Sequence, residues 1–187
     1  EKQARESWFR TYLEAYRESL FETDVSAELA AFRDLVIKTK DMGSKLIFAG
    51  NGASAAISSH AAVDYTKQCE IRSICFNEAD LITCFGNDYG YESWIKEALK
   101  VYADPQDCVV LISSSGSSPN VVEAGKYCRE QNMNLVTFTG FSSSNPLREL
   151  GQTNLWLNSD SYNIVECTHM IWIMAVCSSF SARYRRL

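Results

Sequence analysis

The chain has 187 residues, of which 46% are hydrophobic, and a formal net charge of −5. This size and composition predict one globular domain with a full core, and the interleaved charges argue against a basic nucleic-acid-binding surface. The opening "EKQARESWFRTYLEAYRESLF" is too charged for a signal peptide, and no apolar run is long enough to span a membrane. We therefore expect neither a nucleic-acid partner nor a membrane.

The number and spacing of the cysteines indicate the cellular compartment of the protein. Seven cysteines occur, an odd number, and none forms a C-x-x-C pair. Most lie within apolar runs, which is typical of reduced, buried thiols in a cytoplasmic protein. The closing "ARYRRL" carries Arg183, Arg185 and Arg186, which we expect at a solvated helix end.

Two helices are predicted first, over residues 3–22 and 26–42, from apolar positions at helical spacing. Between them lies the turn-like stretch "ETDVSAE", in which Asp24 or Ser26 supplies a capping oxygen. The first helix has aromatic residues on more than one face. This distribution indicates that the helix packs against another subunit as well as its own core.

From residue 44 onward, short apolar runs alternate with helical stretches, which predicts an α/β fold with a parallel sheet covered on both faces. The predicted strands are 45–50, 71–76, 108–113, 135–140 and 153–157. The predicted helices are 54–68, 91–102, 119–132, a short one at 146–150, and a long closing helix at 162–183. We expect one domain over 1–187, with leading helices in 1–43 and the α/β core with the closing helix in 44–187.

Two strand–loop–helix corners contain loops of small residues, "GNGAS" from residue 50 and "SSSGSSPN" from residue 113. Corners of this kind meet at the carboxyl edge of a parallel sheet, where open α/β sheets bind ligands. The serine loop offers hydroxyls and the unpaired N–H groups of a helix start, which suit a phosphate monoester. An ordinary serine-rich turn with a helix cap is the alternative. Neither loop is a P-loop or a complete dinucleotide-binding fingerprint.

Three segments, "AGNGASAAISSHAAVDY", "CFGNDYGY" and "LISSSGSSPNVVEA", resemble the sugar isomerase (SIS) domain family, and within it the bacterial phosphoheptose isomerases. The resemblance covers essentially the whole chain. It implies a flavodoxin-like three-layer sandwich with a five-stranded parallel sheet and two leading helices, assembled as a homotetramer with sites between subunits. It also implies interconversion of sedoheptulose 7-phosphate and D-glycero-D-manno-heptose 7-phosphate through an enediol, for cell-surface polysaccharide.

The resemblance further implies which residues bind the substrate. The serine loop would hold the phosphate, and the first corner and the "GND" segment would contact the sugar. Ala53 stands where the family usually has glycine. The implied substrate-binding residues are Asn51, Gly52, Ala53, Ser54, Asn87, Asp88, Ser113, Ser114, Ser115 and Ser118.

The chain contains two histidines, His60 and His169, each with a carboxylate at helical spacing, Asp64 and Glu166. The isomerisation needs a base and an acid, and we predict Asp64, His60 and His169 as catalytic residues converging on one cleft. His60, Asp64, Glu166 and His169 could together form an N/O metal site, with zinc as the candidate cofactor. The alternative for His169 is a core histidine bonded to a backbone carbonyl.

The closing helix departs from the family pattern. Relatives carry a glutamine and a histidine eight residues apart, where this chain has Val165 and Ile173. These side chains can neither bind a metal nor transfer a proton. The departure leaves two further functions open: an isomerase of another sugar phosphate, or a non-catalytic SIS tetramer that binds a protein such as the replication initiator. A sugar-phosphate-sensing regulator is less favoured, because no DNA-binding domain is attached.

Overall fold

The computed structural model describes residues 2–181 of the chain. The predicted solvated arginines Arg183, Arg185 and Arg186 lie outside the described residues. The elements, in chain order, are α1 (Lys2–Arg17), a π-helical turn η1 (Glu18–Glu22), α2 (Ser26–Asp41), β1 (Leu46–Gly50), α3 (Ala53–Gln68), β2 (Ser73–Cys75), α4 (Ala79–Tyr89), α5 (Trp94–Tyr102), β3 (Cys108–Ser113), α6 (Pro119–Glu130), β4 (Asn134–Thr139), β5 (Thr153–Trp156) and α7 (Tyr162–Ser178).

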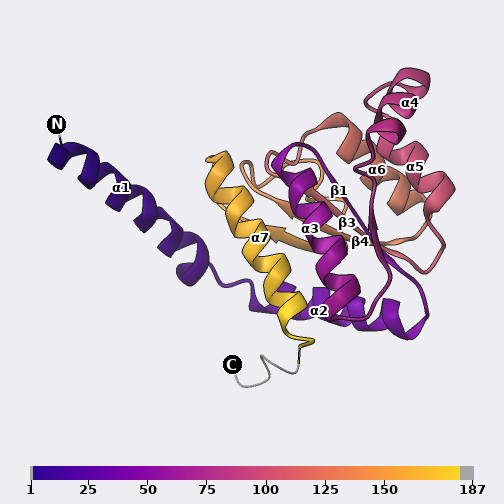
Figure 1. The fold of residues 1–187 in the computed structure, drawn as a ribbon, viewed down its shortest axis with the longest axis horizontal. Coiled ribbons are helices and arrows are strands. Elements are labelled where there is room, and N and C mark those ends of the chain that lie inside the picture. The colour runs from indigo at the N-terminus through magenta and orange to yellow at the C-terminus, as the bar shows by residue number, and fades with distance from the viewer. Residues whose placement is uncertain (1, 182–187) are drawn as a thin grey trace.

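Within the described residues, five parallel strands form the middle layer in the order β2-β1-β3-β4-β5. The central strands β1 and β3 are buried at every residue, because helices cover both faces of the sheet. Side chains of β1 alternate between the two cores: Leu46 and Phe48 enter one, Ile47 and Ala49 the other. α2, α3 and α7 pack on the first face and α5 and α6 on the second (Figure 1). The predicted α/β fold class is confirmed.

The structure differs from the sequence prediction at several boundaries. Residues 79–89 form α4, which was not predicted, although Leu81, Ile82 and Phe85 have helical spacing and pack against the second core. Residues 146–150 form turns instead of a short helix. The predicted strand 71–76 is shorter, and α7 ends at Ser178, before the predicted end of the closing helix.

The first helix extends away from the rest of the molecule (Figure 1). None of the residues of α1 is buried, and large side chains such as Trp8, Phe9 and Leu13 are more than half exposed. Trp8 stacks on Tyr12 with ring centroids 5.3 Å apart, and Tyr12 meets Tyr16 edge to face at 5.6 Å. Tyr12 and Tyr16 pack partly against the first core, whereas the chain itself leaves Trp8, Phe9 and Leu13 uncovered.

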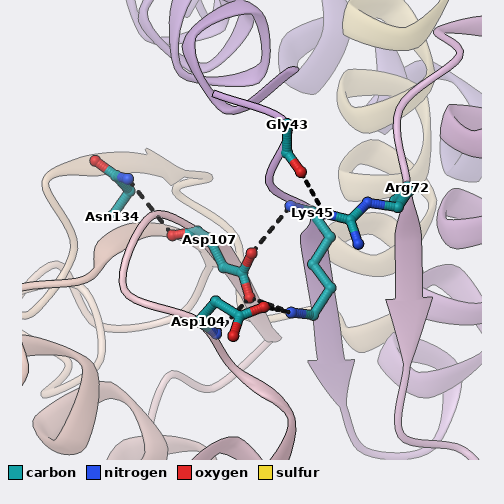
Figure 2. Close-up of polar contacts among 6 residues, drawn as sticks. All are labelled: Gly43, Lys45, Arg72, Asp104, Asp107 and Asn134. Carbon is teal, nitrogen blue, oxygen red and sulfur yellow. Dashed lines mark hydrogen bonds and ion pairs between the residues drawn. The ribbon is translucent and has the colours of Figure 1, made fainter. Parts of the chain in front are cut away.

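A charged cluster around the buried Asp107 joins the amino ends of β1 and β3 (Figure 2). This end of the strands is opposite the edge that carries the small-residue loops. The ammonium of Lys45 lies 2.6 Å from Asp107 Oδ2 and 2.7 Å from Asp104 Oδ2. Asp107 is fully buried, and its carboxylate also accepts the backbone N–H groups of Lys45 and Asp104. Because every oxygen of this buried carboxylate is bonded, the cluster holds the two central strands together at low cost.

Among residues 2–181, no helix is long and apolar enough to cross a membrane.

Candidate functional site

The two small-residue corners lie side by side at the carboxyl edge of the sheet, because β1 and β3 are neighbouring parallel strands. Gly50 ends β1 in tight contact: a Cβ there would stand 2.7 Å from both Ile112 O and Ser54 Cβ. Gly52 follows with a φ of +54°, a conformation that favours glycine. These two glycines therefore bring the start of α3 against the end of β3.

A pair of asparagine side chains joins the corners. Asn51 donates its amide to Asn120 Oδ1 at 2.9 Å, and Asn120 donates back to Asn51 Oδ1 at 2.9 Å. The hydroxyl of Tyr91 also donates to Asn51 Oδ1, at 3.2 Å. Asn120 lies in the first turn of α6 and is almost fully buried. The reciprocal bonds fix the first loop relative to the helix that follows the serine loop.

The serine loop turns from β3 into α6. Ser113 and Ser114 are each only 5% exposed, and Ser118 precedes Pro119, the first residue of the helix. Gly116 has a φ of +62°, and a Cβ there would collide with the Asn145 side chain at 1.9 Å. The loop therefore requires glycine at this one position. The result is a serine-rich turn that leads directly into the amino end of α6 at the carboxyl edge of the sheet.

A cavity of about 100 Å³ opens where the two corners meet. Six of the predicted substrate-binding residues line it: Asn51, Ser54, Ser113, Ser114, Ser115 and Ser118. Tyr162 and Glu166, one turn apart on α7, complete the lining. Burial raises the pKa of Glu166 above its ordinary value, and the nearby Ser114 hydroxyl opposes part of this shift. Among residues 2–181, Ser114 Oγ is buried and makes no hydrogen bond of ordinary geometry, although it lies close enough to the Glu166 carboxyl to influence its pKa.

The remaining predicted substrate residues lie outside this cavity. Ala53 lines a neighbouring, mostly apolar hollow of about 580 Å³ between α1, α3 and α7, which also contacts Glu166. Asn87 and Asp88 are exposed at the end of α4 and bond to each other at 2.9 Å. Tyr162 was not predicted as a site residue. Its spacing of four from Glu166 is the sequence signal that could have found it.

His60 and Asp64 lie on the same side of α3, as their spacing predicts. His60 Nε2 is 3.4 Å from Asp64 Oδ2, and the histidine side chain is 54% exposed. Ser54, which lines the cavity, begins the same helix. Asp64 is ten residues further on, or about 15 Å along the helix axis. The pair is therefore accessible but displaced along α3 from the cavity.

His169 has an entirely different environment. Its side chain is 0% exposed, and Nε2 lies 3.1 Å from the carbonyl oxygen of Thr139. The ring packs edge to face on Phe138 and against Trp172. Burial lowers the pKa of His169 to about 4, although the bond to Thr139 opposes the shift. His169 is the core histidine bonded to a backbone carbonyl that the sequence left as an alternative.

The predicted convergence of His60 and His169 is therefore wrong for a single chain. A buried histidine that stays neutral above pH 4 and bonds to Thr139 does not serve as the acid of an exposed site. Among the described residues, no group of three or more His, Cys, Asp or Glu side chains could hold a metal. His60, Asp64, Glu166 and His169 thus do not form the predicted metal site within one chain. The physical reason is that Glu166 and His169, about 60° apart around the axis of α7, lie on either side of the boundary of its buried face. Glu166 lines the cavity, whereas the His169 ring is buried and bonds to Thr139 O of β4.

Comparison with known proteins agrees with this architecture. The sequence model of the SIS domain matches residues 9–140. The chain belongs to the SIS domain family. The chain is 32% identical to the phosphoheptose isomerase of Maridesulfovibrio salexigens over 151 residues, which cover 78% of this chain and 67% of that protein. It is 30% identical to the phosphoheptose isomerase of Akkermansia muciniphila, over 74% of this chain and 76% of that protein.

Solved structures show the same relationship. The phosphoheptose isomerase from Neisseria gonorrhoeae superposes with a TM-score of 0.84 and 25% identity, over 96% of this chain and 97% of that chain. The fold of the enzyme from Francisella tularensis is similar, with a TM-score of 0.82 and 21% identity. The match extends through α1 and α7, so the leading and closing helices are part of the shared architecture.

Proposed function

We propose that this protein is an aldose–ketose isomerase of the phosphoheptose isomerase type. The reaction interconverts sedoheptulose 7-phosphate and D-glycero-D-manno-heptose 7-phosphate through an enediol and supplies heptose for cell-surface polysaccharide. The similarity to phosphoheptose isomerases over most of the chain supports this reaction. We also propose that the enzyme works in the cytoplasm, where cysteines stay reduced. The cysteines among residues 2–181 are free thiols, which supports this location.

The observation that carries the proposal is the small cavity between the two corners. It combines serine hydroxyls with the amino end of α6, where the helix dipole favours an anion. Ser114 Oγ, which makes no hydrogen bond of ordinary geometry among the described residues, is available to a phosphate oxygen. A cavity of about 100 Å³ suits a phosphate group, while the sugar chain extends outward.

The chemistry at the sugar end is assigned to α3. Moving a proton between adjacent carbons requires a base, and Asp64 or His60 supplies it. Their contact at 3.4 Å lets one orient the other. Asn87 and Asp88, exposed at the end of α4, contact the sugar hydroxyls. Because His60 and Asp64 are displaced along α3 from the phosphate cavity, the site is completed between subunits.

A homotetramer is the assembly that we propose for these intersubunit sites. The exposed side chains of Trp8, Phe9 and Leu13 on α1 and the apolar hollow beside α3 and α7 together form a large hydrophobic surface. Such surfaces mark association sites, and soluble homo-oligomers close them by symmetry. Light scattering should report a tetramer at micromolar concentration. A monomer mass would contradict both the assembly and the shared sites.

Zinc binding is a separate part of the proposal and is limited to His60 and Asp64, since imidazole and carboxylate are ordinary zinc ligands. The larger four-residue set does not fit a zinc ion within one chain, so no step of the reaction is assigned to the metal. Elemental analysis should find zinc in the purified protein and less of it in His60→Ala. Equal metal content in both proteins would overturn this part.

Calorimetry with sedoheptulose 7-phosphate tests the phosphate site. The Ser113→Ala/Ser115→Ala double variant should bind the sugar phosphate at least tenfold more weakly while keeping its fold, because two hydroxyl donors are lost. Ser117→Ala is the matched control: Ser117 belongs to the same loop but is exposed and does not line the cavity. Unchanged affinity in the double variant would count decisively against the site.

A second function is favoured by the closing helix. Val165 and Ile173, at the positions where relatives carry glutamine and histidine, are fully buried, and so is His169. This helix therefore presents Tyr162 and Glu166 to the cavity but no histidine. The protein could then act on another sugar phosphate, or bind a protein partner as a non-catalytic SIS tetramer. NMR assays with a panel of ketose phosphates distinguish the two functions. Turnover of a different ketose supports an isomerase of another sugar phosphate, and no turnover of any of them supports a non-catalytic, partner-binding tetramer.

A further inference from the structure

Two cysteine side chains meet where α3 and α7 end. Cys69 directly follows α3, and Cys177 is the penultimate residue of α7. The Cys69 thiol donates a hydrogen bond to Cys177 Sγ at 3.6 Å, and it also lies 3.7 Å from Cys177 O. Both residues are only 1% exposed. Two thiols from segments 108 residues apart therefore lie in direct contact.

The surrounding contacts hold both segments in place. The Tyr65 hydroxyl donates to Ile173 O at 2.9 Å, which ties the last turns of the two helices together. The ammonium of Lys40 donates to Cys69 O at 2.7 Å. A disulfide has a sulfur–sulfur distance of about 2.05 Å, so closure needs an approach of roughly 1.5 Å. Residues at helix ends can supply this movement, because they carry fewer backbone hydrogen bonds than the helix interior.

The two thiols are chemically unequal. The hydrogen bond from Cys69 stabilises the thiolate of Cys177 and lowers its pKa, although burial opposes this. The same hydrogen bond, together with burial, raises the pKa of Cys69. Since the thiolate is the nucleophile, Cys177 is the attacking sulfur and Cys69 the resolving one. A hollow of about 530 Å³, lined by Lys40, Lys67, Cys69 and Phe180 among others, reaches Cys69, whose sulfur is in contact with that of Cys177.

We propose that Cys69 and Cys177 form an oxidisable dithiol, which a peroxide converts to a disulfide that locks α7 to α3. The Cys177 thiolate attacks one peroxide oxygen, the O–O bond breaks, and a sulfenic acid forms with release of one water. The Cys69 sulfur then attacks the sulfenic sulfur, and the hydroxyl leaves with a proton as a second water. In sum, two thiols and one hydrogen peroxide give one disulfide and two waters.

The crosslink would act on the helices that form the wall of the phosphate cavity. α3 contributes Ser54 to that cavity, and α7 contributes Tyr162 and Glu166. All three lie at the starts of their helices, whereas the cysteines lie at the ends. The disulfide is therefore remote from the bound substrate and changes the rigidity of the wall instead of blocking the cavity.

Peptide mapping of the full chain after treatment with hydrogen peroxide tests the proposal. Trypsin releases Cys69 in residues 68–72, and Cys177 in residues 149–183 together with Cys167, so a Cys167→Ser background leaves one cysteine in the second peptide. We expect these two peptides to be linked after oxidation and separated by dithiothreitol. Cys69→Ser should abolish the link, and Cys84→Ser, which removes an exposed thiol, should leave it. Oxidised Cys84 with Cys69 and Cys177 still free as thiols would overturn the proposal.

A thermal melt supplies a second readout on the same samples. Closing a loop of this length restricts the unfolded chain, so oxidation should raise Tm by several degrees, reversibly with dithiothreitol. Cys69→Ser and Cys69→Ala should both lose this rise, and using both guards against a variant that merely packs badly. A confirmed disulfide with unchanged Tm would overturn the locking of α7 to α3.

Discussion

His60 and His169 each have a carboxylate within one turn of the same helix, yet their environments are opposite. His60 is 54% exposed and lies 3.4 Å from Asp64, whereas His169 is fully buried against Phe138 and bonds to Thr139 O. One ring can exchange protons with a ligand, and the other is a packing residue whose proton affinity is suppressed by burial. Spacing along a helix thus identifies neighbours but not the side of the helix that faces the sheet.

The largest expected effect separates the two residues by activity. His60→Ala should lower turnover of sedoheptulose 7-phosphate by roughly 100- to 10,000-fold, the usual range for an acid–base group, with the fold intact by circular dichroism. His169→Ala, assayed at a temperature where it remains folded, should keep turnover within a fewfold of the wild type. An equal loss of turnover in the two folded variants would contradict the assignment of His60 as catalytic and His169 as a packing residue.

Stability should show the reverse order. His169→Ala removes a buried ring and leaves a cavity beside Phe138 and Trp172, so the free energy of unfolding should fall by about 2–4 kcal/mol in urea denaturation. Thr139 O still accepts the backbone N–H of Leu157, so packing accounts for most of this loss. A variant as stable as the wild type would mean that His169 is not packed in the core.

The pH dependence of stability sharpens the comparison. The folded pKa of His169 is about 4 against an ordinary 6.5, so between these values the unfolded chain binds a proton that the folded chain does not. The free energy of unfolding is therefore unaffected by His169 above pH 6.5. It falls as the pH drops from 6.5 toward 4, in total by about 3 kcal/mol, because the unfolded state gains the proton first. His169→Phe should flatten the slope of unfolding free energy in this window. His60→Ala, the matched control, should retain it.

The smallest expected effect is that of His60 on stability. Its contact with Asp64 is an exposed pair within one helix, and such pairs contribute less than about 0.5 kcal/mol. The urea midpoint of His60→Ala should therefore stay within error of the wild type. A loss above 1 kcal/mol would show that His60 has a structural role in addition to its proposed catalytic one.

Much of the fold could be predicted because burial imposes strong patterns. The apolar run from Leu46 to Gly50 is short and ends in glycine, so a buried strand was the natural prediction, and the other central strands are similar. Helix α4 was missed, although Leu81, Ile82 and Phe85 are spaced as in an amphipathic helix. Its partly covered apolar side gives a weaker pattern than a buried strand does.

The candidate site was predictable to the extent that it depends on backbone corners. Ser54 and the serines of the second loop follow directly from the ends of neighbouring parallel strands, so their convergence was foreseeable. The contributions of α7 were not, because they depend on the rotation of that helix about its own axis. Glu166 faces the cavity and His169 the core, and the sequence alone does not set that rotation.

The projecting first helix has a consequence for folding. A single helix of 16 residues with no buried side chain is only marginally helical in water, because initiation of a helix is unfavourable. Tyr12 and Tyr16 pack only partly on the rest of the chain, so whatever covers Trp8, Phe9 and Leu13 must also supply free energy that keeps this segment helical. By mass action, the order of the first helix then depends on the concentration of its binding partner, while the sheet and its covering helices do not. Dilution would melt the amino-terminal arm first and leave the cavity at the carboxyl edge of the sheet intact.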